Sequence, residues 1–259
     1  MSGKQARRRR QEQARPPTSS TAGRRASPKV LLAVVGALAL IAVAVVLALV
    51  LGGSGSGSTG PTGSTLPDAD VIARQFKGIP QQGDVLGKAS APVTMVQYID
   101  LQCPICRQFE TEVMPTIIER YVRTGKLKVQ SRPIAFIGPD SERGRRATIA
   151  AGQQGHLFDF AQLLYFNQGP ENGGWLDDTM VASAATTIPA IDEQALQEAE
   201  NSSEVADAAK AYDRQATADA VSGTPTILVG KSGGKLRSLG AGAPSVEQLS
   251  AAIDAALAD

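Results

Sequence analysis

The chain is poor in the side chains that build metal sites and disulfide frameworks. Its 259 residues include only two cysteines and one histidine, His156. A structural zinc site takes about four such ligands, so two cysteines and a distant histidine exclude one. Both cysteines fall in a single Cys-x-x-Cys motif, Cys103-Pro104-Ile105-Cys106, which therefore holds the whole thiol content of the protein.

The main part of the chain also lacks an excess of basic residues. The net charge of the whole chain is +1, and residues 1–29 contribute +8 of charge, from nine Lys and Arg against Glu12 alone. The rest of the chain therefore carries −7. A protein body that binds nucleic acid presents a basic face, so we predict no nucleic-acid partner.

Residues 1–29 have no periodic apolar positions and are interrupted by Pro16, Pro17 and Pro28. We interpret them as a disordered basic cytoplasmic segment. The run Arg7–Arg10 has two interpretations, a contact with nucleic acid or phospholipid, or a topology signal in front of a membrane helix. The second is favoured because an apolar span follows directly, and Lys and Arg flanks stay cytoplasmic.

Val30–Leu51 is a run of 22 residues without a charge, in which Gly36 is the only member outside the hydrophobic set. As a helix it would be about 33 Å long, enough to cross a bilayer. A cleavable signal peptide is the alternative, but the apolar core of such peptides is about 7–15 residues long. We therefore predict an uncleaved transmembrane signal anchor, followed by a flexible Gly/Ser-rich linker over residues 52–66.

A globular domain is predicted over residues 67–259. Within it, Val71–Phe76 is either a short helix or an irregular lead-in, and Val85–Gly87 is predicted as a short edge strand. Val93–Ile99 is apolar almost throughout. This pattern is expected of a strand that is buried on both faces in a parallel arrangement.

Residues 104–124 show helical spacing, and we expect a kink at Pro115 because proline removes a backbone donor. Gly125 is predicted to end this helix, and residues 126–133 are predicted as a second strand. Together with Val93–Ile99 they form a β-α-β unit. The Cys-x-x-Cys motif lies at its strand-to-helix turn.

A long helical region is predicted over about residues 139–220, with breaks near 169–174 and 188–189. Two short strands and a closing helix follow it, over residues 226–229, 235–239 and 245–257, with Ser245 as N-cap of the helix. The helices are thus inserted between a β-α-β half and a β-β-α half of an α/β domain. No internal repeat is visible.

The position of the motif predicts different chemistry for its two sulfurs. At a helix N-terminus, Cys103 faces unpaired backbone N–H groups and the positive end of the helix dipole, which favour thiolate over thiol. Pro104 suits the first helical position. Cys106, one turn further on, is expected to be more buried and less acidic. Cys103 is therefore the attacked and leaving sulfur, and Cys106 the resolving one. An inert structural disulfide is an alternative, although so short a loop constrains the unfolded chain little.

Further short motifs run from residue 78 to the C-terminus. Besides Cys103-Pro104-Ile105-Cys106 they are Gly78-Ile79-Pro80-Gln81, Leu86-Gly87, Ala91-Pro92-Val93-Thr94, Gln154-Gly155, Trp175 and Gly223-Thr224-Pro225-Thr226. With these motifs the chain resembles the thioredoxin superfamily, and within it the membrane-anchored DsbA-like thiol:disulfide oxidoreductases of bacteria. The resemblance implies a thioredoxin-like α/β fold with a helical insertion, preceded by one transmembrane helix.

The resemblance also implies a role for Thr224-Pro225. In such proteins the proline is cis and lies against the cysteine pair, so Pro225 is expected to be cis and to keep other groups from crowding Cys103. Thr224 would offer its backbone N–H and C=O to an extended substrate segment. The alternative is a rigid turn before a strand.

An oxidase of this kind passes the Cys103-Cys106 disulfide to reduced or unfolded secreted or membrane proteins through a mixed disulfide on Cys103. We expect no cofactor beyond the cysteine pair. The resemblance implies a single-pass protein of the bacterial cell membrane with its catalytic domain outside the cytoplasm, and a quinone-linked membrane partner that re-oxidises the pair. We expect a monomer, because the added N-terminal domain of dimeric isomerases is absent. A tethered reductase or isomerase, and a non-catalytic tethered binding module, are the alternatives.

Two residues depart from the pattern of these proteins. Ile105 stands where a histidine often lies, and it cannot donate a hydrogen bond to the thiolate. We therefore expect a redox potential below about −120 mV and above about −270 mV, the values of DsbA and thioredoxin. Gln97 stands six residues before Cys103, where a buried Asp or Glu commonly helps to move the proton of the resolving thiol. Cys106 must then lose its proton to water or to another group, which is expected to slow steps that need its thiolate.

The remaining polar or aromatic candidates receive structural interpretations. Arg143, Arg145 and Arg146 either attract acidic substrates or form a solvated helix face, and the second is favoured. His156 is expected to be solvated or packed on an amphipathic helix. Trp175 is expected to anchor the core of the insertion.

Overall fold

The computed structural model describes residues 63–258. The predicted basic segment 1–29 and membrane span Val30–Leu51 lie outside these residues. Within residues 63–258, no helix is both long enough and apolar enough to cross a membrane. Residues at the end of the predicted linker contact α8, since the Ser64 N–H donates to Ser183 Oγ at 3.1 Å and the Leu66 N–H to Thr187 Oγ1 at 2.7 Å.

The sheet is built around β3 (Val93–Ile99), whose seven residues are all buried. It runs parallel to β4 (Leu127–Pro133) on one side and antiparallel to β5 (Thr226–Lys231) on the other. Because β3 has a neighbouring strand on each side and helices over both faces, its near-continuous apolar sequence is explained. The predicted burial of this strand is confirmed.

Three further pairings complete the sheet, β1 with β2, β2 with β4, and β5 with β6. The strand order is β1-β2-β4-β3-β5-β6, with β1 at Gln81–Gln82, β2 at Val85–Leu86 and β6 at Arg237–Ala241. The predicted edge position of β2 is wrong, because the two-residue strand β1 folds back on it and takes the edge. The strand predicted at 235–239 begins two residues later, because residues before Arg237 form the turn that follows β5.

Alternate residues of β3 face two different cores. Met95 and Ile99 join the main core, which is closed by α5 (Met114–Ile117) and α11 (Val246–Ala258). Val96 and Tyr98 belong to a smaller cluster on the other face, which includes Ala216 of α10 (Ser203–Ala218). This period of two follows from the strand geometry. The N-cap of α11 is Ser245 as predicted, with its Oγ accepting from the Gln248 N–H at 3.2 Å.

The helical run after β3 is less regular than a single kinked helix. It consists of α4 (Pro104–Gln108), the π-helical segment η1 (Phe109–Val113), α5, and a second π-helical segment η2 (Ile118–Val122). The amide of Met114 bonds to the carbonyl of Phe109, five residues back. The irregularity expected at Pro115 is thus a π turn directly before it. Gly125 ends the run at φ 76°, a backbone conformation that favours glycine.

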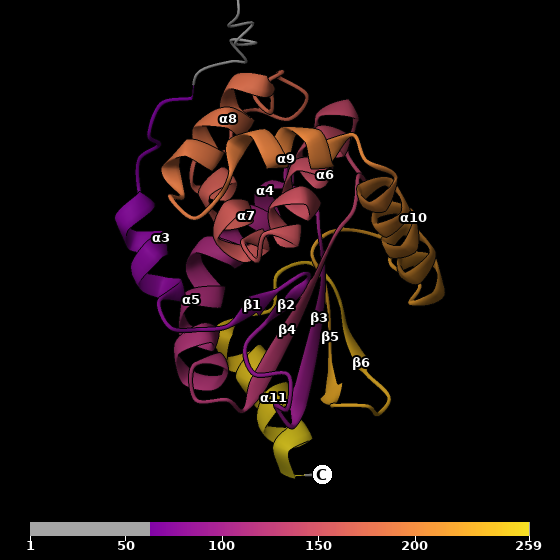
Figure 1. Ribbon diagram of the computed structural model, residues 1–259. Helices are drawn as coiled ribbons and strands as arrows, with labels where there is room; N and C mark the ends of the chain where they lie inside the picture. The colour runs from indigo at the N-terminus through magenta and orange to yellow at the C-terminus, as the bar shows by residue number, and fades with distance from the viewer. Residues whose placement is uncertain (1–62, 259) are drawn as a thin grey trace, which may run out of the picture. The chain divides into compact units, whose positions relative to one another are not determined.

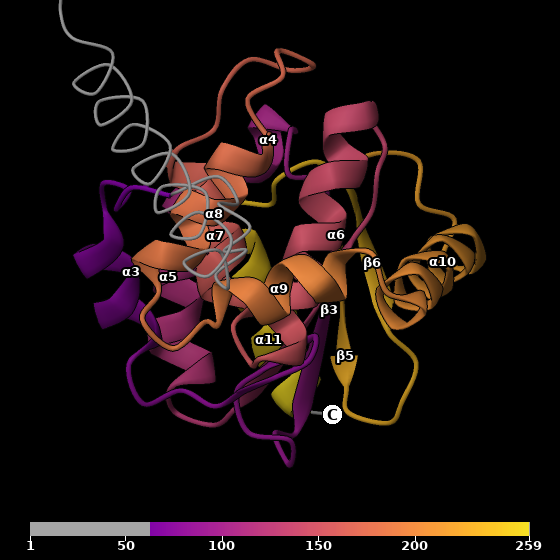
Figure 2. The same cartoon turned by 45° about the horizontal axis from the view of Figure 1, so that its top comes forward.

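The predicted helical insertion is confirmed between β4 and β5. Figure 1 shows α6, α7, α8 and α9 gathered at one end of the sheet with α10 beside it, and Figure 2, turned by 45°, keeps α4 at that same end. Their bounds are Pro139–Gln153 for α6, Leu157–Phe166 for α7, Asp178–Thr187 for α8 and Glu193–Glu200 for α9. The breaks predicted near 169–174 and 188–189 separate α7, α8 and α9. The lead-in at Val71–Phe76 is a helix, α3 (Ala69–Phe76).

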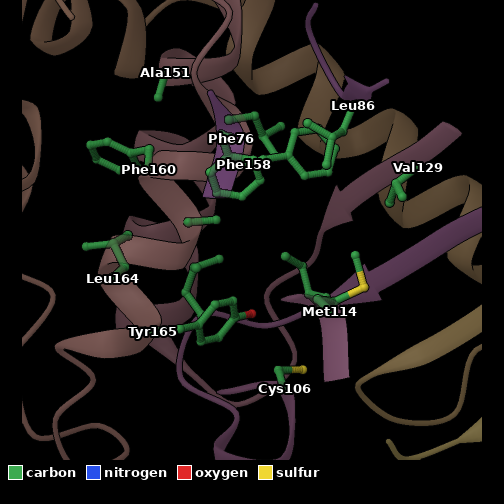
Figure 3. Packing of buried hydrophobic residues seen from close by; sticks show 14 of the residues in the cluster. Phe76, Leu86, Cys106, Met114, Val129, Ala151, Phe158, Phe160, Leu164 and Tyr165 are labelled. Atoms are coloured by element: carbon green, nitrogen blue, oxygen red, sulfur yellow. The ribbon is translucent and has the colours of Figure 1, made fainter. Parts of the chain in front are cut away.

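Helix α7 lines the core beneath the Cys-x-x-Cys helix. Figure 3 shows Phe158, Phe160 and Tyr165 of α7 in the same packed region as Cys106 and Met114. Tyr165 and Cys106 are both fully buried. The active-site helix is therefore seated on the insertion as well as on the sheet.

Candidate active site

Cys103 lies at the start of α4, after the short loop that follows β3. The strand ends at Ile99, three loop residues follow, and Cys103 is the N-cap of the helix with an extended backbone of φ −70° and ψ 118°. Its Sγ accepts from the Cys106 N–H at 3.4 Å, and Pro104 occupies the first helical turn. Both features match the prediction, because a side-chain acceptor at the N-cap satisfies an otherwise unpaired backbone donor.

The two thiols differ in burial and acidity. Both are free, with Cys103 6% exposed and Cys106 fully buried. Hydrogen bonding from the Cys106 thiol, from the Thr224 side chain and from the backbone N–H groups of Cys106 and Ile105 lowers the pKa of Cys103 to about 6, against the opposing effect of burial. Burial, followed by the interaction with Cys103, raises the pKa of Cys106 well above its ordinary value. The predicted asymmetry of the pair is confirmed.

The Thr224-Pro225 peptide bond is cis, as predicted. It faces the first cysteine, since the Cys103 thiol donates to the Thr224 carbonyl at 3.3 Å. The Pro225 carbonyl in turn accepts from the Gly242 N–H at 2.7 Å, which ties this loop to the end of β6. Two distant parts of the sequence therefore meet at the Cys103 sulfur, and a third holds the Thr224-Pro225 loop in place.

Alkylation of the reduced chain should report the acidity of Cys103 directly. Because only the thiolate reacts, we expect the iodoacetamide rate at Cys103 to be half-maximal near pH 6. The urea-unfolded chain serves as control, with a half-maximal rate near the ordinary thiol pKa of about 8.5. A folded-state midpoint at the control value would contradict the assignment. The depressed pKa also stabilises the reduced fold above the unfolded pKa, and this contribution is lost as the pH falls through about 6.

Asp100, in the loop before Cys103, is the acceptor that shapes the active-site turn. It is fully buried. Its Oδ1 accepts from the Gln102 N–H at 2.9 Å and the Ser141 hydroxyl at 2.7 Å, and its Oδ2 from the N–H groups of Phe136 at 2.7 Å and Ile137 at 2.9 Å. Four charge-assisted bonds thus join the turn, the segment after β4 and the start of α6. Asp100 was not among the site residues predicted from the sequence.

Two glutamines attach the same turn to the insertion. Gln102 is fully buried, and its Nε2 donates to Ser141 Oγ at 2.9 Å and to Asn172 Oδ1 at 3.2 Å. Gln168, after α7, donates to the carbonyls of Leu101 at 2.8 Å and Cys103 at 3.2 Å. Uncharged residues on separate elements leave no pattern in sequence, so these anchors were not predicted.

Gln97 has the buried position on β3 that was predicted for it, and an acid lies opposite. Gln97 is 1% exposed, and its Nε2 donates to Glu110 Oε1 at 2.7 Å. Glu110, in η1, is 6% exposed, and burial raises its pKa to about 7, with the hydrogen bond from Gln97 acting in the opposite direction. Its spacing of four residues after Cys106 was a signal that sequence analysis missed, because i and i+4 share a helix face.

The two middle residues of the motif, Pro104 and Ile105, are open to solvent. Ile105 is 46% exposed, and Phe136, 56% exposed, is another large apolar side chain open to solvent after β4. Because β3 and β4 are parallel, the segments after both strands start from the same edge of the sheet. An isoleucine side chain has no donor for the Cys103 thiolate, so the acidity of Cys103 comes from the other contacts.

The other predicted candidates lie in structural contacts. His156 begins α7 and its Nδ1 pairs with Asp159 at 2.9 Å, as expected for a packed histidine. Trp175 packs partly buried against the main core. The three arginines of α6 pair with carboxylates of their own chain, namely Asp178, Glu200, Glu142 and Asp213.

The interpretation of these arginines as a solvated face is wrong for Arg145. It is 8% exposed because it bridges Glu142 on its own helix and Asp213 of α10, the latter at 2.7 Å. Among residues 63–258, no group of three or more His, Cys, Asp or Glu side chains is arranged to hold a metal ion.

The chain is similar to known proteins over the part that carries this site. A family model described as Thioredoxin matches residues 81–255. The probable disulfide bond formation protein D of Bacillus cereus is 28% identical over 147 residues, which are 56% of this chain and 68% of that protein. The disulfide bond formation protein D of Bacillus subtilis is 27% identical over 133 residues, and the match spans 50% of this chain and 58% of the relative.

The fold has a solved counterpart. The crystal structure of oxidised BdbD from Bacillus subtilis superposes with a TM-score of 0.60 at 22% identity, covering 70% of this chain and 98% of the other. At this identity the likeness concerns the fold.

Proposed function

The chain belongs to the thioredoxin family as a DsbA-like thiol:disulfide oxidoreductase, and from this premise we propose that it is an oxidase of proteins outside the cytoplasm. It would donate the Cys103-Cys106 disulfide to reduced or unfolded secreted or membrane proteins.

The observation that carries this proposal is the asymmetry of the cysteine pair. Cys103 is acidic and lies at the helix N-terminus, whereas Cys106 is fully buried and weakly acidic. A client thiolate attacks Cys103 Sγ, an S–S bond forms between client and Cys103, and the Cys103–Cys106 bond breaks with its electron pair on Cys106. A second client thiolate then attacks the client's own sulfur, and Cys103 leaves as a thiolate.

The acidity of Cys103 sets the direction of exchange. At pH 7, about one unit above a pKa of about 6, thiolate formation stabilises the reduced protein by about 1.4 kcal/mol, which corresponds to about 30 mV for two electrons. A protein whose reduced form is stabilised is an oxidant. With Ile105 in place of a donor, this effect stays smaller than in DsbA.

Thr224 is proposed to hold the client. Its carbonyl accepts from the Cys103 thiol in the free protein, and that donor disappears when Cys103 ionises. The carbonyl then becomes available to an N–H of an extended client segment. A backbone contact of this kind is independent of client sequence, which suits a broad range of unfolded substrates.

We also propose where the enzyme is located and what re-oxidises it. Val30–Leu51 would anchor the chain in the bacterial cell membrane, with residues 1–29 in the cytoplasm, the linker 52–66 as a tether and the catalytic domain outside as a monomer. A quinone-linked membrane protein would re-oxidise Cys103 and Cys106. The support for this part is the 22-residue apolar run and the family resemblance.

The redox potential tests the direction. Equilibration of the full chain with glutathione should give a value between about −120 and −270 mV. The in-cell redox state, read by trapping free thiols with a maleimide in the membrane fraction, should be mainly oxidised. A potential below about −270 mV, or a fully reduced pair in cells, would replace the oxidase by a reductase.

A further inference from the structure

Gln168 joins the helical insertion to the backbone of the attacked cysteine. It follows α7 and is partly buried. Its Nε2 donates to the Leu101 carbonyl at 2.8 Å and to the Cys103 carbonyl at 3.2 Å. One amide group therefore bridges the turn that leads from β3 into α4. The exchange steps described above give this contact no part.

Gln168 is itself held in a fixed place. Its backbone N–H donates to the Tyr165 carbonyl at 3.3 Å, which continues the last turn of α7. The next residue, Gly169, passes so close to Trp175 that a Cβ there would lie 2.7 Å from Trp175 Cγ. Trp175 in turn packs against the main core. The side chain of Gln168 thus starts from backbone that is anchored on both sides.

The Cys103 carbonyl is the acceptor that begins α4. The Arg107 N–H donates to it at 3.0 Å as the first bond of the helix, and Gln168 supplies a second donor. A carbonyl oxygen has two lone pairs, so both are used. Because Cys103 is the N-cap, the position of this carbonyl fixes the peptide plane at which extended backbone turns into helix.

That peptide plane decides where the sulfur lies. Cys103 Sγ contacts the Cys106 N–H at 3.4 Å and the Thr224 carbonyl at 3.3 Å. The N–H stabilises a thiolate, whereas a carbonyl oxygen cannot donate to one. A rotation of the N-cap that moves Sγ away from the N–H therefore makes the thiolate less stable. Helix α4 has only five residues before the π-helical segment, so its own bonds constrain this end weakly.

We propose that Gln168 is a positioning residue for thiol–disulfide exchange, whose amide holds the Cys103 carbonyl so that the sulfur stays at the helix N-terminus. The proposal deepens the proposed function and rests on it, because it takes Cys103 as the attacked and leaving sulfur. Gln168 touches no reacting atom. It acts through the backbone of Cys103, since a sulfur that is more stable as a thiolate is a better leaving group.

The test compares variants of the full chain that remove or restore the donor at position 168. Gln168→Met has a side chain of similar length without an N–H group. We expect the midpoint of iodoacetamide alkylation at Cys103 to rise from about 6 by about half to one pH unit. Gln168→Lys restores an N–H donor. At high salt, which screens the added charge, its midpoint should return to the wild-type value.

Two outcomes of this comparison overturn the proposal. In the first, Gln168→Met folds and keeps the wild-type midpoint. In the second, Gln168→Lys keeps the raised midpoint of Gln168→Met, which would mean that packing and not the donor matters.

Asn167→Leu is the matched control, an amide replaced by an apolar side chain of similar shape at the neighbouring position. Asn167 is also partly buried, but its Nδ2 donates to the Leu163 carbonyl of its own helix, at 2.9 Å. The alkylation midpoint should stay at the wild-type value. A shift as large as that of Gln168→Met would assign the effect to the end of α7 in general, against the proposal.

The alkylation midpoint reports on Cys103 and not on its neighbours. The titratable groups that share this corner of the fold are Cys106, Tyr165, Asp100 and Glu110. Burial raises the pKa of Cys106 and that of Tyr165 well above their ordinary values, so both are protonated near pH 6. None of the variants changes these groups.

The same variants should differ in their equilibrium with glutathione. A less stable thiolate destabilises the reduced form alone. At pH 7 the equilibrium constant for reduction of the Cys103–Cys106 disulfide should therefore fall about three- to fivefold in Gln168→Met. An unchanged constant contradicts the proposal. A wild-type potential below about −270 mV would instead end the oxidase direction, and the difference between the variants would remain.

A measurement on the unsubstituted chain does not depend on the folding of a variant. In the ¹⁵N-labelled reduced chain, the side-chain amide resonances of Gln168 should move with the ionisation of Cys103 near pH 6, because their acceptor belongs to that residue. The side-chain amide resonances of Asn167 should stay in place. Gln168 resonances that do not move in this range contradict the proposal.

Discussion

The Cys103→Ser variant should lose thiol–disulfide exchange by about 1,000-fold or more, whereas Cys106→Ser should hold clients in a covalent complex. A serine hydroxyl at position 103 forms no mixed disulfide, so no step can begin. With serine at position 106, the Cys103 thiolate attacks a client disulfide, a bond forms between Cys103 and the client, and one client thiolate leaves. This mixed disulfide persists because no Cys106 thiol is present to resolve it.

The measurement for this pair combines rate and capture. Oxidation of a reduced dithiol peptide gives the rate, and non-reducing gels with mass spectrometry of Cys103 adducts give the trapped clients. The two variants control each other, because each retains one cysteine. A Cys103→Ser chain that still performs its cellular task would favour the non-catalytic binding module whose disulfide is structural.

Replacement of Asp100 by alanine should lower the free energy of unfolding by about 3–5 kcal/mol, the typical cost of breaking a buried charged network. The change leaves three backbone N–H groups and the Ser141 hydroxyl without their acceptor inside the protein. Each buried orphan donor costs about 1–3 kcal/mol, and these costs overlap. Asp100→Asn should also lower the free energy of unfolding. One carboxylate oxygen is replaced by an NH₂ group, which donates hydrogen bonds and would point at groups that are themselves donors.

Urea denaturation of the reduced chain measures this effect, and Asp140→Ala is the control. Asp140 accepts a single exposed bond, from the Gly174 N–H at 2.8 Å, so its loss should cost about 0.5–1.5 kcal/mol. A loss below about 1 kcal/mol for Asp100→Ala would mean that water replaces the carboxylate. The iodoacetamide profile of Cys103 should broaden in the same variant, because the turn before it is no longer fixed.

The sequence predicted those features whose causes are local. The apolar run Val93–Ile99 and the Cys-x-x-Cys turn after it each carry a short pattern with a direct physical meaning, whereas the cis bond of Thr224-Pro225 was implied by the family resemblance. The membrane anchor over Val30–Leu51 remains a prediction. The predicted edge position of β2 was wrong by one strand, because β1 pairs with its outer side. The predicted start of β6 was wrong by two residues, because residues 235 and 236 belong to the connection from β5.

The features that sequence analysis missed depend on contacts across the fold. The backbone N–H groups of Phe136 and Ile137 donate to Asp100 from 36 and 37 residues further along the chain, and no local sequence pattern predicts these bonds. For Glu110 the signal existed, since it follows Cys106 by four residues, but its meaning depends on Gln97 reaching it from another element. The single substitution at position 97 could be recognised from sequence, whereas its counterpart on the helix became visible only in three dimensions.

The bonds from Gln168 to the carbonyls of Leu101 and Cys103 bear on how this protein could be shortened or recombined. Deleting residues 139–220 would remove Gln168 with both of its bonds, and Ser141 and Asn172 as well, so the active-site turn would lose its hydrogen-bond partners in the insertion. The insertion is therefore a working part of the catalytic unit and not a detachable module. Chimeras that exchange it between relatives should carry the turn from Asp100 to Cys103 along with it.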